Sequence, residues 1–419
     1  MKPSILFVNT GTGRNLGDRA MLLSLMEKLR QLGCGSLQVP RQLPEVFQRE
    51  FQATAYTPYH ECLDRFRRRL PAGALGRLLL ACCYTLHVLC MALACLLCRF
   101  VPLPLTARVD EIQLLGHLKQ VDAVWLNGGG YLTDKGQYEA RCCLLTGVFA
   151  LLMGKKVVLS GQGIGPIHSR LTRFLLRYLT RHATYVSVRD DVRALEFLHQ
   201  LTNGQVPIIM AGDDASSLTM ANLPSLSPTD SGLQSIPCIA LHFRISPFTE
   251  NSQQLKQQFA DTVAQVFAQG WKPVFFIFTS QTEWEEDLLH SLLNGVNEDR
   301  YEIVTSDDPR VIKSHIARCD IALGIAYHFI VFCLTTGTPV IALYGGEYYR
   351  CKMAGILNQY HREHWMTEFS NFVAKNTTAS LAGFLPELNL IHTELQQQTS
   401  HITEHHHQSI HNALRAISQ

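Results

Sequence analysis

The sequence predicts an α/β protein built from two doubly wound parallel sheets that face a cleft. Three observations predict this fold. Short apolar runs alternate with stretches of helical length along most of the chain, one polar segment interrupts the alternation, and several apolar runs end in glycine-rich loops. Continuous apolar strands separated by helices are typical of parallel sheets that are covered on both faces.

The first half of the chain supplies the strands and helices of one domain. Its first strand is expected at Ser4–Asn9, and a helical pattern follows at Arg19–Leu32. Later strands are expected at Ala123–Asn127, Lys156–Ser160, Tyr185–Val188 and Ile208–Ala211, with helices at Glu139–Met153, Ser169–Arg181 and Asp191–Gln200.

The second half repeats the alternation after a segment rich in Ser and Pro. Strands are expected there at Ile239–Phe243, Val274–Thr279, Tyr301–Val304, Ile321–Gly324 and Val340–Tyr344. We therefore predict an N-terminal Rossmann-like domain over residues 1–221, a linker over 222–237, a second Rossmann-like domain over 238–375 and a helical tail over 376–419.

The region of about residues 54–109 breaks this pattern and is expected to be a helical insertion. Its segment Leu78–Cys98 has no charged residue and is long enough to span a bilayer. Arginines precede it, namely Arg65, Arg67, Arg68, Arg69 and Arg77. A spanning helix would separate the first strand from the rest of its sheet, so a peripheral contact with anionic lipid is favoured over a span. A buried hairpin or an oligomer contact is the remaining interpretation.

Composition excludes several classes of protein. The chain of 419 residues has 47% hydrophobic and 17% charged residues and a formal net charge of +2, so no general basic field indicates nucleic-acid binding. Its 13 Cys form neither a disulfide ladder nor a zinc pattern, and the N-terminus runs into a strand without a signal peptide. We expect a cytoplasmic protein, peripheral to the inner face of the plasma membrane.

Glycine-rich segments follow three of the expected strands. The first, from Asn9 to Asp18, has the spacing Gly-x-Gly-x-x-x-Gly, and no acidic residue ends the next strand near Ser36–Val39, so it matches neither a dinucleotide loop nor a Walker loop. It is expected either to bind an anion or to be a capped turn. The other segments are Gly128–Gly130 and Gly161–Pro166. The three should meet at one edge of the sheet and form an amide-lined crevice.

The combination of Asn15-x-Gly17-Asp18, Gly128-Gly129-Gly130, Gly161-Gln162-Gly163-Ile164-Gly165-Pro166 and Ser187-Val188-Arg189-Asp190 resembles the polysaccharide pyruvyl transferase family. The resemblance covers about residues 4–360, apart from the insertion. It implies two domains of glycosyltransferase-B type. It also implies transfer of a pyruvyl group from phosphoenolpyruvate to a sugar of a cell-surface polysaccharide or its precursor, usually as a cyclic ketal.

The family's Arg-Leu-His motif corresponds here to Ala326-Tyr327-His328. The His is kept, but Ala326 replaces the Arg, which removes a charge-assisted pair worth about 2 kcal/mol. Another cation replaces it, the substrate differs, or the activity is lost; the candidate cations are Arg14, Arg189, Arg350 and Lys352.

The resemblance implies roles for individual residues. His328 is expected to be a general acid or a hydrogen-bond donor to phosphate, and Asp18 is expected to be a general base. The substrate-binding set is Asn15, Gly17, Gly129, Gly130, Gln162, Gly163, Gly165, Arg189, Arg350 and Lys352. No metal and no cofactor beyond the donor phosphoenolpyruvate are expected.

Structural roles remain open for the same side chains. His328 is alternatively a helix-start residue, Asp18 a helix cap, and Arg189 the partner of Asp190 in an ion pair. Two further functions also remain open: a glycosyltransferase that uses a nucleotide sugar, and a catalytically degenerate binding protein.

Overall fold

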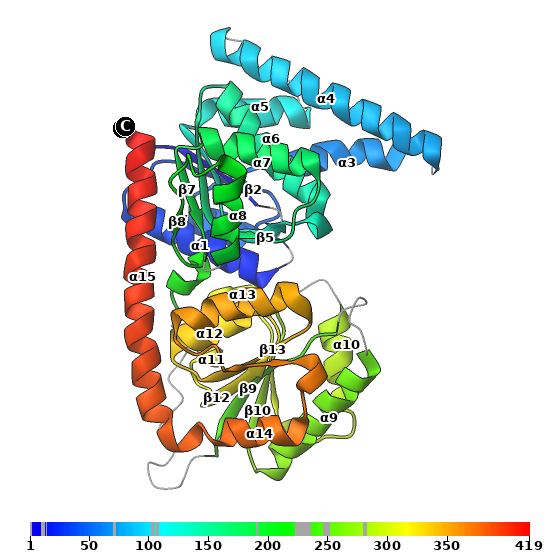
Figure 1. Cartoon of the computed structure of the whole chain (residues 1–419), viewed down its shortest axis with the longest axis vertical. Coiled ribbons are helices and arrows are strands. Elements are labelled where there is room, and N and C mark those ends of the chain that lie inside the picture. Colours follow the sequence, from blue (N-terminus) through cyan, green and yellow to red (C-terminus); the bar gives the residue numbers. More distant parts are fainter. Residues whose placement is uncertain are drawn as a thin grey trace. The chain divides into compact units, whose positions relative to one another are not determined.

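The chain, shown as a computed structural model in Figure 1, is described for residues 2–9, 13, 15–69, 73–101, 105, 109–189, 192–222, 236–245, 252–279 and 283–419. Contacts divide it into two compact units. Unit 1 holds Met1–Gly13, Met21–Asp213 and His406–Gln419, and unit 2 holds Arg14–Ala20 and Asp214–His405. Each unit is built on a parallel sheet, so the predicted α/β class with two doubly wound sheets is confirmed. The exact domain boundaries stay predictions, and residues 223–235 of the expected linker lie outside the described residues.

The sheet of unit 1 has the strand order β3-β2-β1-β4-β6-β7-β8, with β5 paired to β6, and its paired strands are parallel. The strands are β1 Ile5–Val8, β2 Leu37–Pro40, β3 Thr54–Tyr56, β4 Ala123–Leu126, β5 Gly129–Leu132, β6 Lys156–Ile164, β7 Tyr185–Val188 and β8 Ile209–Met210. Every residue of β1 and β4 is buried, which explains why these strands are continuous apolar runs.

Helices between these strands cover the sheet (Figure 1). They are α1 Leu16–Gln31, α2 Glu45–Glu50, α5 Asp110–Gln120, α6 Gln137–Leu152, α7 Arg170–His182 and α8 Val192–Thr202. Helix α7 begins where the Ser169 hydroxyl accepts from the Thr172 N–H, at 3.3 Å, as an N-cap does. The first turn of α1 is counted with unit 2, and the rest of the helix with unit 1.

Two glycine-rich segments of unit 1, expected to be loops, belong to β-strands. Gly129 and Gly130 lie in β5 rather than in a loop, and β6 continues past its expected end at Ser160 to Ile164. The reason is a local irregularity of β6, since Gly161 has φ +54°, a conformation open to glycine, and the register shifts there. The continuation pairs with β5 through Gly129 and Gln162.

The apolar insertion contains two helices, α3 Tyr59–Arg69 and α4 Ala74–Phe100. Its first residues form the short edge strand β3, which the sequence analysis did not expect. Helix α4 is long and apolar enough to cross a membrane by length and composition alone.

Unit 2 has a six-stranded parallel sheet in the order β11-β10-β9-β12-β13-β14. Its strands are β9 Cys238–His242, β10 Lys272–Phe276, β11 Glu302–Val304, β12 Ile321–Gly324, β13 Val340–Tyr344 and β14 Met366–Glu368. The helices are α9 Ser252–Ala268, α10 Glu283–Leu292, α11 Pro309–Ile316, α12 Tyr327–Thr336, α13 Gly346–Gln359, α14 Ala374–Ala382 and α15 Leu388–Ser418. The last part of α15, from His406 onward, is counted with unit 1. Helix α12 is buried at all ten positions, so it forms the centre of the layer that covers this sheet.

Candidate functional site

The strand order of unit 2 reverses between β9 and β12. Strands β9, β10 and β11 succeed one another to one side, and β12, β13 and β14 to the other. Ligands of doubly wound sheets bind beyond the carboxyl ends of the strands at such a point. The two strands are parallel and in register, with Gly324 opposite His242. The residues just after them, Phe243–Arg244 and Ile325–His328, are therefore where the chemistry of this unit is expected.

Residues 15–20 also lie at this end of the second sheet, although they precede the whole of unit 2 in the sequence. Asn15 forms an isolated antiparallel bridge with Thr279, and the Leu16 N–H donates to the Phe278 carbonyl at 3.3 Å. Phe278 and Thr279 follow β10 in the chain, so these backbone contacts hold the start of α1 at the carboxyl ends of the strands.

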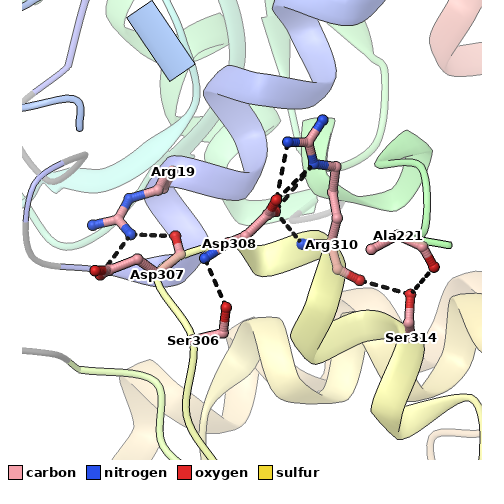
Figure 2. Close-up of polar contacts among 7 residues, drawn as sticks. All are labelled: Arg19, Ala221, Ser306, Asp307, Asp308, Arg310 and Ser314. Atoms are coloured by element: carbon pink, nitrogen blue, oxygen red, sulfur yellow. Dashed lines mark hydrogen bonds and ion pairs between the residues drawn. The ribbon is translucent and has the colours of Figure 1, made fainter. Parts of the chain in front are cut away.

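A buried arginine fastens the same segment a second time (Figure 2). The Arg19 guanidinium Nη1 donates to the backbone oxygen of Asp307 and lies 3.1 Å from its carboxylate Oδ1. Asp307 is itself positioned by its neighbour Asp308, which caps α11 and accepts from the Arg310 N–H at 2.9 Å. Arg19 is almost completely buried, whereas the Asp307 side chain is largely exposed, so this contact lies at the surface of unit 2.

Gly17 and His328 meet at the first turns of two helices. The Asn15 side-chain oxygen accepts from the Gly17 N–H at 2.9 Å, which makes Asn15 the N-cap of α1. A Cβ on Gly17 would lie 1.7 Å from His328 Nδ1, so only glycine lets the imidazole pack there. His328 is the second residue of α12 and is buried. Two helix N-termini, each with a partial positive charge, thus come together, and this favours an anion.

Lys352 lies near this meeting point, and Arg350 is engaged elsewhere. The Lys352 ammonium is 4.5 Å from the centre of the Tyr327 ring, and that ring contacts His328 edge-on at 5.1 Å between centroids. Arg350 instead makes two hydrogen bonds to Glu347, at 2.6 and 2.9 Å, on an exposed part of α13. Of the two predicted basic residues, Lys352 is the one that these contacts connect to His328.

A second polar cluster adjoins Ala326, the residue that replaces the family arginine. The Ala326 N–H donates to His242 Nδ1 at 3.3 Å, so the other ring nitrogen of His242 faces Glu285, whose Oε1 is 3.6 Å away. The Arg244 Nε lies 4.0 Å from the same oxygen, and about a third of the Arg244 side chain is exposed. Arg244 therefore adds a partly exposed cation to the Glu285–His242 cluster that adjoins Ala326, and no sequence motif had marked it as a candidate.

Glu285 is the negatively charged member of this cluster and also binds the turn after β10. Burial raises the pKa of its carboxyl, but the adjacent His242 imidazole and hydrogen bonds from Thr279 and the Phe278 N–H outweigh burial and lower the pKa to about 2. The carboxylate is consequently ionised near neutral pH. It accepts from the Phe278 N–H at 2.7 Å and from the Thr279 N–H at 3.2 Å, so it also fixes the turn that follows β10.

The remaining predicted residues gather at the carboxyl ends of the first sheet. Gln162 is buried and donates to the Leu126 carbonyl at 2.7 Å. A Cβ on Gly163 would lie 3.1 Å from the Gly129 oxygen and 3.4 Å from the Arg189 guanidinium carbon, so the glycine permits a close approach of both. Gly130 is exposed in β5, and the Gly165 N–H donates to the Leu132 carbonyl at 2.9 Å.

Arg189 is in the interior of unit 1. Only 1% of its side chain is exposed, and its Nε lies 3.1 Å from the carboxylate of the fully buried Asp213. The same nitrogen donates to the Gly161 carbonyl at 3.4 Å. The sequence alternatively predicted an ion pair between Arg189 and Asp190, but Asp190 lies outside the described residues. The partner observed is Asp213. A buried pair of this kind contributes to positioning the end of β7.

The predicted residues thus fall into two groups, one in each unit. Unit 2 brings together Asn15, Gly17, Asp18, His328 and Lys352, with Asp18 half-buried in the first turn of α1. Unit 1 brings together Gly129, Gln162, Gly163 and Arg189 near the carboxyl ends of its strands, with Gly130 and Gly165 nearby. Arg14 is outside the described residues. Among the residues described, no group of three His, Cys, Asp or Glu could hold a metal ion. The catalytic and binding roles of these residues stay predictions.

Comparisons with known proteins agree with the fold. A family model described as polysaccharide pyruvyl transferase matches residues 15–346. Among solved structures, the chain is similar to a UDP-GlcNAc 2-epimerase from Neisseria meningitidis bound to UDP-GlcNAc, at TM-score 0.58 and 10% identity, covering 99% of this chain and 100% of that one. It is also similar to a glycosyltransferase from Rickettsia africae, at TM-score 0.57 and 10% identity, covering 100% and 99%.

A further similar structure is a putative UDP-N-acetylglucosamine 2-epimerase from Listeria monocytogenes, at TM-score 0.56 and 13% identity, covering 95% of this chain and 91% of that one. Likeness at these identities is a likeness of fold alone. Among curated protein sequences, none matches the chain.

Proposed function

Because the chain belongs to the polysaccharide pyruvyl transferase family, we propose that it transfers a pyruvyl group from phosphoenolpyruvate to a sugar of a cell-surface polysaccharide or its precursor. The observation that carries this proposal is the contact of Gly17 with His328, where two helix N-termini meet at the switch point of the second sheet. The carboxylate and phosphate of phosphoenolpyruvate are the kind of anion that such a position favours.

The reaction forms a ketal in two stages. A proton added to the methylene carbon of phosphoenolpyruvate creates a methyl group and a positive charge on the adjacent carbon, which a sugar hydroxyl attacks. Phosphate then leaves, and a second hydroxyl closes the ring. Of the two protons that the hydroxyls lose, one balances the proton added to carbon and the other leaves with phosphate. The donor is the only cofactor-like molecule that this reaction requires.

Residues of unit 2 are proposed for each step. His328 donates the proton to carbon, or a hydrogen bond to the leaving phosphate, and Asp18 accepts the hydroxyl proton. Arg244 and Lys352 hold anionic oxygens, with Arg244 compensating for the arginine that Ala326 replaces. The exposed third of Arg244 and its contact with Glu285, which faces the His242 ring that Ala326 donates to, support this assignment.

The test is consumption of phosphoenolpyruvate by the purified full-length protein in the presence of a panel of amino sugars and hexoses, both free and as lipid-linked precursors. Release of inorganic phosphate, together with a mass increase of the acceptor that matches a pyruvyl ketal, would support the proposal. If phosphoenolpyruvate stays intact with every acceptor and a nucleotide sugar is consumed instead, the proposal fails.

The alternative of a nucleotide-sugar glycosyltransferase is favoured by one observation, the similarity of fold to proteins of that class and to an epimerase bound to UDP-GlcNAc. A degenerate, non-catalytic binding protein is the second alternative, and Ala326 favours it. If the wild type consumes phosphoenolpyruvate and His328→Ala does so at the same rate, the proposed role of His328 is wrong. If the wild type turns over neither donor, the binding-protein alternative replaces the proposal.

A cytoplasmic location is also proposed. All 13 cysteines are free thiols, and most of them are buried. Free thiols are typical of a reducing compartment such as the cytoplasm. A sugar or polysaccharide-precursor acceptor at the inner face of the plasma membrane would be within reach of a protein bound there.

A further inference from the structure

Helix α4 presents a continuous apolar surface on the outside of unit 1. Its most apolar stretch of 18 residues has a mean hydropathy of 2.2, yet only 11% of that stretch is buried. Leu78, Leu86, Leu89 and Leu93 are each 58–64% exposed. Thr85 is the one serine or threonine of this helix. Its hydroxyl donates to the Ala81 carbonyl at 2.8 Å, so its hydrogen-bonding capacity is met within the helix and not by water. A helix of a soluble protein normally has polar side chains on such a face.

The opposite side of α4 carries His87 toward the protein. His87 lies between the Tyr59 hydroxyl, 2.9 Å from its Nδ1, and the Glu111 carboxylate, 2.8 Å from its Nε2. Met91 and Cys95 on this side are buried in the core of unit 1. A hydrogen-bonded histidine inward and leucines outward are the reverse of the usual arrangement, and this pattern is expected when the surrounding medium is apolar.

Positive charge is concentrated in the part of the sequence that contains this helix. Residues 65–109 contain seven arginines, Arg65, Arg67, Arg68, Arg69, Arg77, Arg99 and Arg108, and no Asp or Glu. The whole chain has a formal net charge of +2, so the other residues together carry 2 − 7 = −5. A basic segment beside an apolar face complements the negative surface of an anionic bilayer.

The sheet of unit 1 excludes a single crossing of the membrane by α4. Strand β1 precedes the helix and β4 follows it, yet the two pair in parallel, from Ile5 opposite Ala123 to Val8 opposite Leu126. A helix that crossed once would leave these strands on opposite sides of the bilayer. Figure 1 shows α4 running instead along the outer side of unit 1, beside α3, α5 and α6, which it contacts.

We propose that α4 lies in the plane of an anionic lipid surface, with its leucine face among the acyl chains and its exposed Arg77 and Arg99 attracted to the lipid phosphates. The helix is then an interfacial membrane anchor rather than a transmembrane span or a contact between two copies of the chain. The proposal does not depend on which reaction the protein catalyses.

The first test is flotation of the full-length protein with vesicles. The wild type should bind vesicles of phosphatidylcholine with 30% phosphatidylglycerol and bind pure phosphatidylcholine much less. The double variant Leu89→Glu/Leu93→Glu should lose at least about tenfold in binding, since two charges would enter the apolar layer. Replacing Arg77 with Gln should cost about fivefold at low salt. The matched control is Leu171→Glu, a leucine of similar exposure on α7, which should bind like the wild type.

Absence of binding to either vesicle, or equal binding by the double variant and the wild type, would overturn the proposal. So would a lipid-free dimer that the double variant dissociates in analytical ultracentrifugation while no vesicle is bound.

A second measurement on protein with an unaltered leucine face keeps the proposal testable if the double variant fails to fold. Spin labels are placed singly at the exposed thiols Cys82 and Cys90, with the other reactive thiols replaced by Ser. A helix in the membrane plane gives the two labels similar depths, since they lie only about 80° apart around its axis. A helix along the bilayer normal separates them by about 12 Å, from a rise of about 1.5 Å per residue, and that result would contradict the proposal.

Discussion

The contact between Gly17 and His328 couples the first helix of the chain to the proposed chemistry. The imidazole packs against the Gly17 backbone, where any side chain would overlap it. The N–H of Gly17 is capped by Asn15, so the residue cannot move away without losing this hydrogen bond. At this position the absence of a side chain determines where the proposed acid lies.

Gly17→Ala should therefore lower kcat of the phosphoenolpyruvate reaction at least about tenfold, because a displacement of about 1 Å of a reacting group has such an effect. The matched control is Gly116→Ala, also a helical glycine, whose Cβ would meet its nearest neighbour only at 3.9 Å. Steady-state kinetics and thermal unfolding should show an unchanged kcat and slightly higher stability for the control. Equal kcat values for both variants would show that His328 is not positioned by Gly17.

Glu285 makes stability depend on pH in a defined range. Its pKa in the folded protein is about 2, against an ordinary value of 4.5, so its stabilising contribution is complete above about pH 4.5 and is lost as the pH falls toward 2. Glu285→Gln should lower the free energy of unfolding at pH 7 by about 2–3 kcal/mol and should flatten its decline between pH 4.5 and 2. Urea unfolding across this range measures both effects. Glu286→Gln, at the exposed neighbour, should do neither.

At the scale of elements, a buried ion pair stabilises the end of β7. Arg189 follows this strand and pairs with Asp213, which follows β8, so the pair joins the ends of two neighbouring strands. Neither side chain has access to water, and the attraction is correspondingly strong.

Asp213→Ala should lower the free energy of unfolding by about 3–5 kcal/mol, because it leaves the Arg189 charge buried without its carboxylate. Chemical denaturation measures the change, and the exposed acid of α8 provides the control Glu196→Ala, with an effect within about 0.5 kcal/mol. A loss below about 1 kcal/mol for Asp213→Ala would indicate that Arg189 is accessible to solvent or to a ligand, as the substrate-binding prediction requires.

Elements with a strong local pattern could be predicted from the sequence, and those formed by pairing could not. The continuous apolar runs Ile321–Gly324 and Val340–Tyr344 are strands at the expected bounds. The three-residue strand Thr54–Tyr56 has no periodic signal of its own and exists because β2 pairs with it. Gly129–Leu132 has the composition of a loop, and its pairing with β6 depends on the irregularity at Gly161.

The site shows the same limit. Gly17 and His328 belong to recognisable motifs, and the fold brings them together as a common site requires. Arg244 carries no motif, and its contact with Glu285, which follows the neighbouring strand β10, arises only from the folded sheet. Similarly, Arg19 finds its partner Asp307 at a separation of 288 residues, a pairing that no local pattern encodes.

At the scale of the whole molecule, we propose that unit 2 holds phosphoenolpyruvate where the first turns of α1 and α12 meet. Family membership, the switch point between β9 and β12, and the cation supplied by Arg244 all support this claim. The membrane anchor proposed for α4 belongs to unit 1 and would keep the enzyme close to an acceptor on lipid.

The most direct measurement is titration calorimetry of phosphoenolpyruvate with the full-length protein and its variants Arg244→Ala and His328→Ala. The wild type should bind, and Arg244→Ala should bind about 30-fold more weakly, since one charge-assisted pair is worth about 2 kcal/mol. His328→Ala should also weaken binding. The control Arg300→Ala, an exposed arginine beside the amino end of β11, should bind like the wild type. Absence of binding by the folded wild type, or equal affinity in all four proteins, would contradict the claim.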